Sequence, residues 1–145
     1  MKYQLDLIIN KPRSQVWQVF NDPEKIKSWQ PSLVEIRLIN GTQGQPGAES
    51  RLTFTEKGRV FSLVETITQR QEPECLEQRY ENQFATNTVR HRFAVRGQEE
   101  TLWTTETEYR FKTLLMKIMG PLYRKNLAAR TRRDMEHFKE LVEKE

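Results

Sequence analysis

A single cysteine, Cys75, is present among 145 residues, so the chain cannot form an internal disulfide bond. One thiol cannot supply the cysteine cluster of a structural zinc site, and His91 and His137 lack the spacing of metal ligands. We therefore expect no metal and no other cofactor. The low cysteine content fits a reducing compartment, and we expect a cytoplasmic protein.

Long apolar runs are missing too. No stretch of about 18 apolar residues occurs, so the sequence predicts no transmembrane segment. The first residues, MKYQLDLIINKP, turn polar too early for a signal peptide. Glycine and proline number only six each, whereas seven Phe, four Tyr and three Trp exceed what a disordered chain contains. The composition thus predicts one folded domain over residues 1–145.

Familiar catalytic motifs are absent as well. The sequence has no phosphate-binding glycine loop and no serine in a nucleophile elbow. Cys75 lies beside a predicted turn with no histidine close to it in sequence, which indicates an inert thiol. These absences exclude several large enzyme classes and leave acid–base chemistry open.

Charge is distributed unevenly along the chain, whose 24 basic and 20 acidic residues give a net charge of +4. Residues 110–133 contain no acidic residue and eight basic ones: Arg110, Lys112, Lys117, Arg124, Lys125, Arg130, Arg132 and Arg133. This stretch is either a solvated helix face that acidic strands offset, or a surface that attracts an anionic ligand, a membrane or RNA. No nucleic-acid motif accompanies it, and the aromatic residues do not interleave with it as a stacking platform requires. We expect no nucleic-acid partner.

The N-terminal part predicts one strand followed by two short helices. Apolar residues alternate over residues 3–9, as in a strand with one buried face. Val16, Trp17 and Phe20 then recur at helical spacing. A second helix is predicted to begin at Asp22, a good N-cap, and to continue past Trp29; Phe20, Trp17 and Trp29 are interpreted as packing residues of these helices.

The middle of the chain predicts strands, and the last third predicts helix. Residues 34–111 alternate in about six strands, with a glycine-containing loop at 40–47. The apolar stripe of the C-terminal part rotates at Gly120 and Pro121, so a short helix or lid is expected up to Met119. The main helix is expected from about Pro121 to residue 143, and we expect residues 112–119 to be mobile and to gate a cavity.

This order of elements has a simple physical solution, in which six or seven antiparallel strands curl into a half-barrel and the long helix covers the concave side. Here the chain resembles the START-like, or SRPBCC, superfamily, with its polyketide cyclase-like and pollen-allergen-like members. The residues that carry the resemblance are Pro12, Val16 and Trp17 at the first helix, residues 21–29 (NDPEKIKSW), the glycine-rich loop 41–47 and the closing stretch 120–143.

The resemblance covers nearly the whole chain and implies an α+β helix-grip fold. In this fold a curved antiparallel sheet of six to seven strands wraps around a long C-terminal helix, and two short helices follow the first strand. The superfamily includes carriers, cyclases, hydrolytic enzymes and chaperone regulators, so membership alone does not fix the function.

Turn positions predict which side chains share the concave face. Turns at 73–74, at 85–86 and after Gly97 would align Ile67, Tyr80, His91 and Thr107 in one row across the sheet, and Glu65, Asn82, Val89 and Tyr109 in the next. So many polar groups on the face that also holds the large apolar residues predict a cavity, because each would cost ~1–3 kcal/mol if buried unpaired. The candidate ligand-binding residues are Phe54, Phe61, Leu63, Ile67, Gln78, Tyr80, Asn82, His91, Phe93, Trp103, Thr107, Tyr109 and Met119.

Three functions are compatible with this pattern. The first, implied by the resemblance, is binding of a hydrophobic small molecule such as a lipid, polyketide, isoprenoid or aromatic compound. The second is a polyketide cyclase/dehydrase-like enzyme in which Glu65 or His91 is the general acid or base. The third is a protein- or membrane-surface interaction module that uses the basic stretch with Leu114, Leu115, Met116 and Met119, provided these residues are exposed. The sequence leaves open whether the protein is a monomer or a homodimer.

Overall fold

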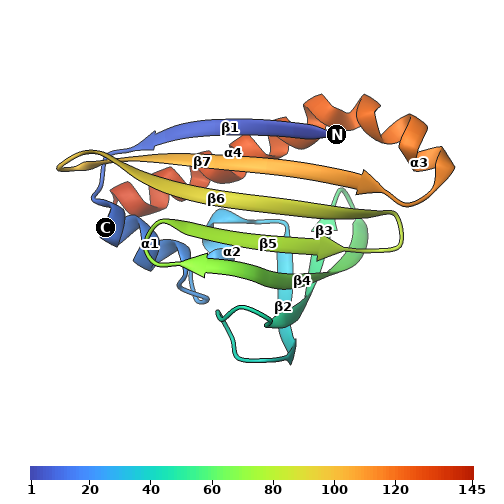
Figure 1. Ribbon diagram of the computed structural model, residues 1–145, viewed down its shortest axis with the longest axis horizontal. Helices are drawn as coiled ribbons and strands as arrows, with labels where there is room; N and C mark the ends of the chain where they lie inside the picture. Colours follow the sequence, from blue (N-terminus) through green and yellow to red (C-terminus); the bar gives the residue numbers. More distant parts are fainter.

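One seven-stranded antiparallel sheet forms the body of the molecule, with the strand order β1-β7-β6-β5-β4-β3-β2. The computed structural model describes all residues 1–145 (Figure 1). The elements are β1 (Lys2–Ile9), α1 (Arg13–Phe20), α2 (Ile26–Trp29), β2 (Leu33–Asn40), β3 (Glu49–Glu56), β4 (Arg59–Gln71), β5 (Cys75–Glu81), β6 (Ala85–Gly97), β7 (Glu100–Phe111), α3 (Leu114–Met119), the 3-10 helix η1 (Gly120–Tyr123) and α4 (Arg124–Glu143). The predicted helix-grip architecture is confirmed.

The long helix α4 lies along β1 and buries one apolar stripe. Arg124 donates a hydrogen bond to the carbonyl of Lys2 (3.1 Å) near the start of α4, and Lys139 donates to the carbonyl of Ile8 (2.6 Å) near its end. The stripe consists of Met135, Phe138 and Val142, which recur at helical spacing and are almost completely buried. It meets an aromatic cluster in which the ring of Phe138 lies 5.1 Å from those of Trp29 and Trp103.

The second short helix begins later than the sequence predicts. Asp22 does not cap a helix; its carboxylate accepts a hydrogen bond from the backbone N–H of Glu24 (3.0 Å) and so closes a turn. Helix α2 therefore consists only of Ile26–Trp29. The expected short helix up to Met119 is present as α3, and the 3-10 helix η1 separates it from α4.

The predicted strand registers are wrong by small steps, although the predicted rows lie on the expected face. The turn between β5 and β6 occupies residues 82–84, not 85–86, because the Asn82 side chain accepts hydrogen bonds from the N–H groups of Phe84 and Ala85. Tyr80 consequently pairs with Asn87. In the next pair of strands, β6 and β7, His91 lies opposite Thr105 and not opposite Thr107. A shift by an even number of residues keeps each side chain on its face, which is why the concave surface was still predicted.

A bulge in β4 changes the face of the residues that follow it. Pairing with β5 shifts between Ile67 and Gln69, leaving Thr68 unpaired. Simple alternation would turn Arg70 away from the concave side on which Ile67 lies. With the extra residue, Arg70 pairs with Leu76, and both lie on the concave side with Ile67.

Candidate functional site

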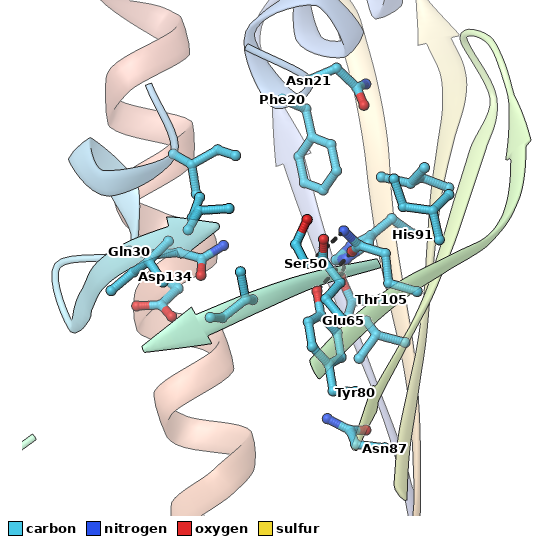
Figure 2. Close-up of a pocket in the computed structure, with 18 of the residues that line it drawn as sticks. Phe20, Asn21, Gln30, Ser50, Glu65, Tyr80, Asn87, His91, Thr105 and Asp134 are labelled. Atoms are coloured by element: carbon cyan, nitrogen blue, oxygen red, sulfur yellow. Dashed lines mark hydrogen bonds between the residues drawn. The ribbon is translucent and has the colours of Figure 1, made fainter. Parts of the chain in front are cut away.

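A cavity of about 430 Å³ lies between the concave face of the sheet and helices α2 and α4. Half of its 30 lining residues are hydrophobic, so the wall is more polar than the predominantly apolar lining of an ordinary small-molecule site. Figure 2 shows the side chains of the sheet, among them Glu65, Tyr80 and His91, facing Gln30 and Asp134 on the helical side. A space of this size that opens to the surface is filled by water or by a ligand.

Polar side chains from β4 and β5 form a hydrogen-bonded group on the sheet side. Gln78 Nε2 donates to Glu65 Oε2 (3.1 Å), and the Tyr80 hydroxyl donates to Gln78 Oε1 (2.9 Å). Glu65 pairs across the strands with Tyr80, and Ser50 of β3 lies directly opposite Glu65. Burial raises the pKa of Glu65. The carboxyl group is thereby suited to donate a hydrogen bond or a proton to a bound molecule.

His91 of β6 is held in a neutral form. Its Nδ1 accepts a hydrogen bond from the indole N–H of Trp103 (3.2 Å), and the Thr105 hydroxyl lies 3.4 Å from the same nitrogen. Burial lowers the pKa of His91 to about 3. Because Nδ1 is an acceptor, the ring proton resides on Nε2. The neutral histidine can therefore donate a hydrogen bond through Nε2, and the lowered pKa disfavours a protonated ring.

Two cavity-lining residues have buried polar atoms without a hydrogen-bond partner. They are the indole N–H of Trp29, whose side chain is 95% buried, and the side-chain oxygen of Asn87. Buried polar atoms are almost always satisfied in folded proteins. One donor and one acceptor, both on residues that line the cavity, are thus left without a partner inside the protein.

The cavity reaches the surface between the α1–α2 connection and the β2–β3 loop. Its exposed lining residues, Pro23 and Gln43, belong to these two segments. Arg70 donates a hydrogen bond to the carbonyl of Gly44 and forms an ion pair with Glu72 (3.3 Å), which fixes the loop at this opening. The glycine-rich loop predicted from the sequence is therefore one side of the mouth.

Asp134 of α4 lies on the helical side of the cavity. Burial raises its pKa to about 6, against the opposing effect of Arg130. No three His, Cys, Asp or Glu side chains are arranged to hold a metal ion. The two acidic side chains of the cavity wall lie on different elements, Glu65 on the sheet and Asp134 on helix α4.

Eight of the fourteen candidate binding and acid–base residues predicted from the sequence line the cavity. They are Glu65, Ile67, Gln78, Tyr80, His91, Trp103, Thr107 and Tyr109. Their grouping follows from the strand pairings, in which Glu65, Tyr80, Asn87 and Tyr109 form one row and Ile67, Gln78, Val89 and Thr107 the next.

The other six candidates lie elsewhere. Phe54 and Phe61 stack on each other (5.2 Å) beneath the guanidinium of Arg130, and Leu63 packs in the same small cluster. Phe93 is buried in the main core against Trp17 and Phe20. Asn82 closes the β5–β6 turn, and Met119 lies on α3 with 37% of its surface exposed. Residues 112–119 do not line the cavity, so the expected gate in this segment is wrong.

Several lining residues were not predicted. Phe20 and Trp29, interpreted as packing residues, also contact the cavity, and Ser50, Arg70, Asn87 and Asp134 complete its polar wall. Asn87 and Ser50 follow from the true registers, which the turn residues alone did not reveal. Asp134 had a signal in the sequence, since it is the first acidic residue after the basic stretch and lies one position before the buried Met135.

Solved structures share this fold at low sequence identity. A START superfamily protein from Mycobacterium smegmatis superposes with a TM-score of 0.81 and 14% identity, covering 99% of this chain and 97% of that one. The Zhui aromatase/cyclase from Streptomyces sp. R1128 gives 0.78 and 11%, covering 99% and 93%. Norcoclaurine synthase from Thalictrum flavum, in complex with dopamine and hydroxybenzaldehyde, gives 0.73 and 15%, covering 98% and 86%.

These likenesses confirm the START-like resemblance at the level of fold. No curated protein matches the chain in sequence. None of the helices combines the length and the apolar composition that crossing a membrane requires. Over residues 2–143 the chain matches the family described as polyketide cyclase / dehydrase and lipid transport, and it belongs to that family.

Proposed function

We propose that this protein binds a largely apolar small molecule that carries at least one oxygen atom, in the cavity between the sheet, α2 and α4. The observation that carries the proposal is the unpartnered indole N–H of Trp29 in the wall of a cavity of about 430 Å³. An N–H donor in such a wall is satisfied by a carbonyl, hydroxyl or ether oxygen of the ligand. The lipid, polyketide, isoprenoid and aromatic classes all provide oxygens of this kind.

The composition of the wall supports a small hydrophobic ligand with few polar groups. Aromatic rings of Phe20, Trp29 and Trp103 form one end, and the Glu65–Gln78–Tyr80 group forms a polar patch on the sheet. Pockets that orient small molecules combine apolar surface with convergent polar groups in the same way. The unpartnered oxygen of Asn87 adds an acceptor, which suits a ligand hydroxyl.

The relatives support the same class of ligand. The family description names polyketide cyclases and lipid transport, and the Thalictrum flavum enzyme was solved with dopamine and hydroxybenzaldehyde, both oxygenated aromatic molecules. The fold thus holds such compounds elsewhere, and this chain retains a cavity of suitable size.

Native mass spectrometry of the purified protein, followed by binding of matched probes, tests the proposal. We expect a co-purified small molecule or tight binding of 2-naphthol, and weaker binding of naphthalene, which lacks the oxygen. Trp29→Phe retains the aromatic ring and removes the N–H, so it should reduce the preference for 2-naphthol by roughly tenfold, as expected for one hydrogen bond of about 1.4 kcal/mol.

Trp17→Phe is the matched control. The indole N–H of Trp17 donates to Glu72 (2.7 Å), and the residue does not line the cavity, so the preference should remain. The proposal would be contradicted if the wild-type protein bound neither probe and no small molecule co-purified with it. Equal preference in the Trp29→Phe protein would reject the role of the indole N–H.

A further inference from the structure

Residues 114–123, which comprise α3 and η1, expose an unusual density of large apolar side chains. Leu114, Leu115, Ile118 and Leu122 are 75%, 64%, 65% and 78% exposed. Leu114, Leu115 and Ile118 lie within about 100° of one another around α3, and Leu122 continues this exposed apolar stripe on η1. Figure 1 shows α3 at the end of the molecule beyond the sheet, away from α1 and α2.

The fold itself does not use this stripe. The segment is held by other atoms, because the Thr113 hydroxyl caps α3 by accepting from the N–H of Met116 (3.1 Å) and Gly120 packs directly on the ring of Phe111. The neighbouring β5–β6 turn adds a further exposed ring, Phe84 (47% exposed), whose carbonyl accepts from the N–H of Lys112. Of the other exposed apolar residues, Val34, Leu38 and Ile39 lie on the edge strand β2, whereas Val60 and Val95 lie singly on separate strands, which is ordinary for a protein surface.

Cations flank the apolar stripe on both sides along the chain. Arg110 and Lys112 precede it and Arg124 and Lys125 follow it, while Lys117 lies within α3. Glu108 and Glu81 pair with the first two, and the remaining three have no acidic partner. An apolar stripe bordered by unpaired cations is the pattern of helices that lie in the interface of an anionic membrane.

Charge also argues against a second copy of this chain as the occupant. A symmetric dimer through this stripe would bring Lys117, Arg124 and Lys125 of one copy close to those of the other, and such like charges repel. The side chains project from the end of the molecule, and a fluid bilayer accepts protruding side chains without a complementary pocket. A lipid surface with negative headgroups fits both the shape and the charge.

We propose that residues 114–123 dock this protein onto the surface of an anionic lipid bilayer, with Leu114, Leu115, Ile118 and Leu122 inserted among the acyl chains near the headgroups. Lys117, Arg124 and Lys125 bind the headgroup phosphates. The docking surface is separate from the cavity mouth, so this proposal does not depend on the proposed ligand.

Flotation with vesicles tests the proposal directly. The full chain should float with vesicles of equimolar phosphatidylcholine and phosphatidylglycerol, bind vesicles of phosphatidylcholine alone far more weakly, and dissociate as salt is raised. Leu115→Ser/Ile118→Ser should weaken binding by ~tenfold or more, and Lys117→Gln/Lys125→Gln should remove most of the salt dependence. Val60→Ser/Val95→Ser, which changes two equally exposed apolar residues outside the segment, is the matched control and should bind like wild type.

Thermal melting of each variant verifies the fold, which exposed substitutions should leave intact. No binding of the wild-type protein to anionic vesicles overturns the proposal, and so does equal loss of binding in the control. Analytical ultracentrifugation provides the remaining outcome. A wild-type dimer that Leu115→Ser/Ile118→Ser converts to a monomer, without vesicle binding, would assign the stripe to self-association and reject the membrane.

Discussion

Among single residues, His91 links its buried, neutral state to the pH dependence of protein stability. The side chain is buried and neutral, with a pKa of about 3 in the folded protein against an ordinary value of 6.5. Between these values the unfolded chain binds one more proton than the folded one. The free energy of unfolding therefore falls on acidification, by ~1.4 kcal/mol per pH unit from this group alone.

His91→Gln should make this contribution disappear. Near neutral pH the variant should be ~1–3 kcal/mol less stable, since the indole N–H of Trp103 loses the imidazole nitrogen that accepts its hydrogen bond. At about pH 5 this deficit should shrink by about 2 kcal/mol, because the wild type has by then lost the stability that depends on a neutral imidazole. Urea denaturation at the two pH values measures both numbers.

The exposed His137 provides the control, through His137→Gln. Its effect on stability should be small at both pH values because the residue is at the surface. Parallel pH profiles of the wild type and His91→Gln would contradict the buried neutral state.

At this scale the sequence predicted the sheet residues of the site better than its helical ones. Tyr80, His91 and Thr107 follow from alternation, which places every second residue on one face regardless of even shifts in register. Trp29 and Asp134 depend on how α2 and α4 are placed over the sheet. That placement results from packing between distant segments, which periodicity does not encode.

At the scale of elements, the junction of α3 and η1 depends on one close contact. A Cβ atom added to Gly120 would clash with the ring of Phe111, although the backbone of Gly120 is helical and accepts any residue. The glycine is thus required by close approach and not by its backbone conformation.

Gly120→Ala should destabilise the protein by ~1–3 kcal/mol, the usual cost of overpacking. Adding Phe111→Leu should recover part of the loss, so the two substitutions should be non-additive in a double-mutant cycle. Denaturant unfolding of the two single variants and the double variant provides the measurement. Effects that add to within ~0.5 kcal/mol would show that the ring does not restrain the junction.

The turns explain why the elements were predicted correctly and their registers were not. Gly58 and Gly97 mark their turns by residue type, and both turns occur near the predicted positions. The β5–β6 turn depends on Asn82, whose side chain accepts two backbone hydrogen bonds, and the β4 bulge at Thr68 has no comparable marker. Because residues such as Asn82 and Thr68 also occur in regular strands, their types alone do not predict the turn or the bulge.

For the whole molecule, the cavity lies where the two parts of the hydrophobic core meet. Trp29, Ile67 and Trp103 of its wall belong to the main cluster, whereas Leu33 and Leu52 belong to the smaller one. An occupant therefore contacts both parts at once, so its binding free energy should stabilise the entire fold and not only the mouth.

Saturation with 2-naphthol should accordingly raise the free energy of unfolding by about 2.7 kcal/mol at a hundredfold excess over Kd, which follows from binding to the folded state alone. Tryptophan fluorescence, to which Trp29 and Trp103 of the cavity wall contribute, should report the same melting temperature as far-UV circular dichroism. Both transitions should move upward together by several degrees. If ligand shifted the fluorescence transition alone, the cavity wall would unfold separately from the sheet, and the coupling of the two core clusters through the bound molecule would be refuted.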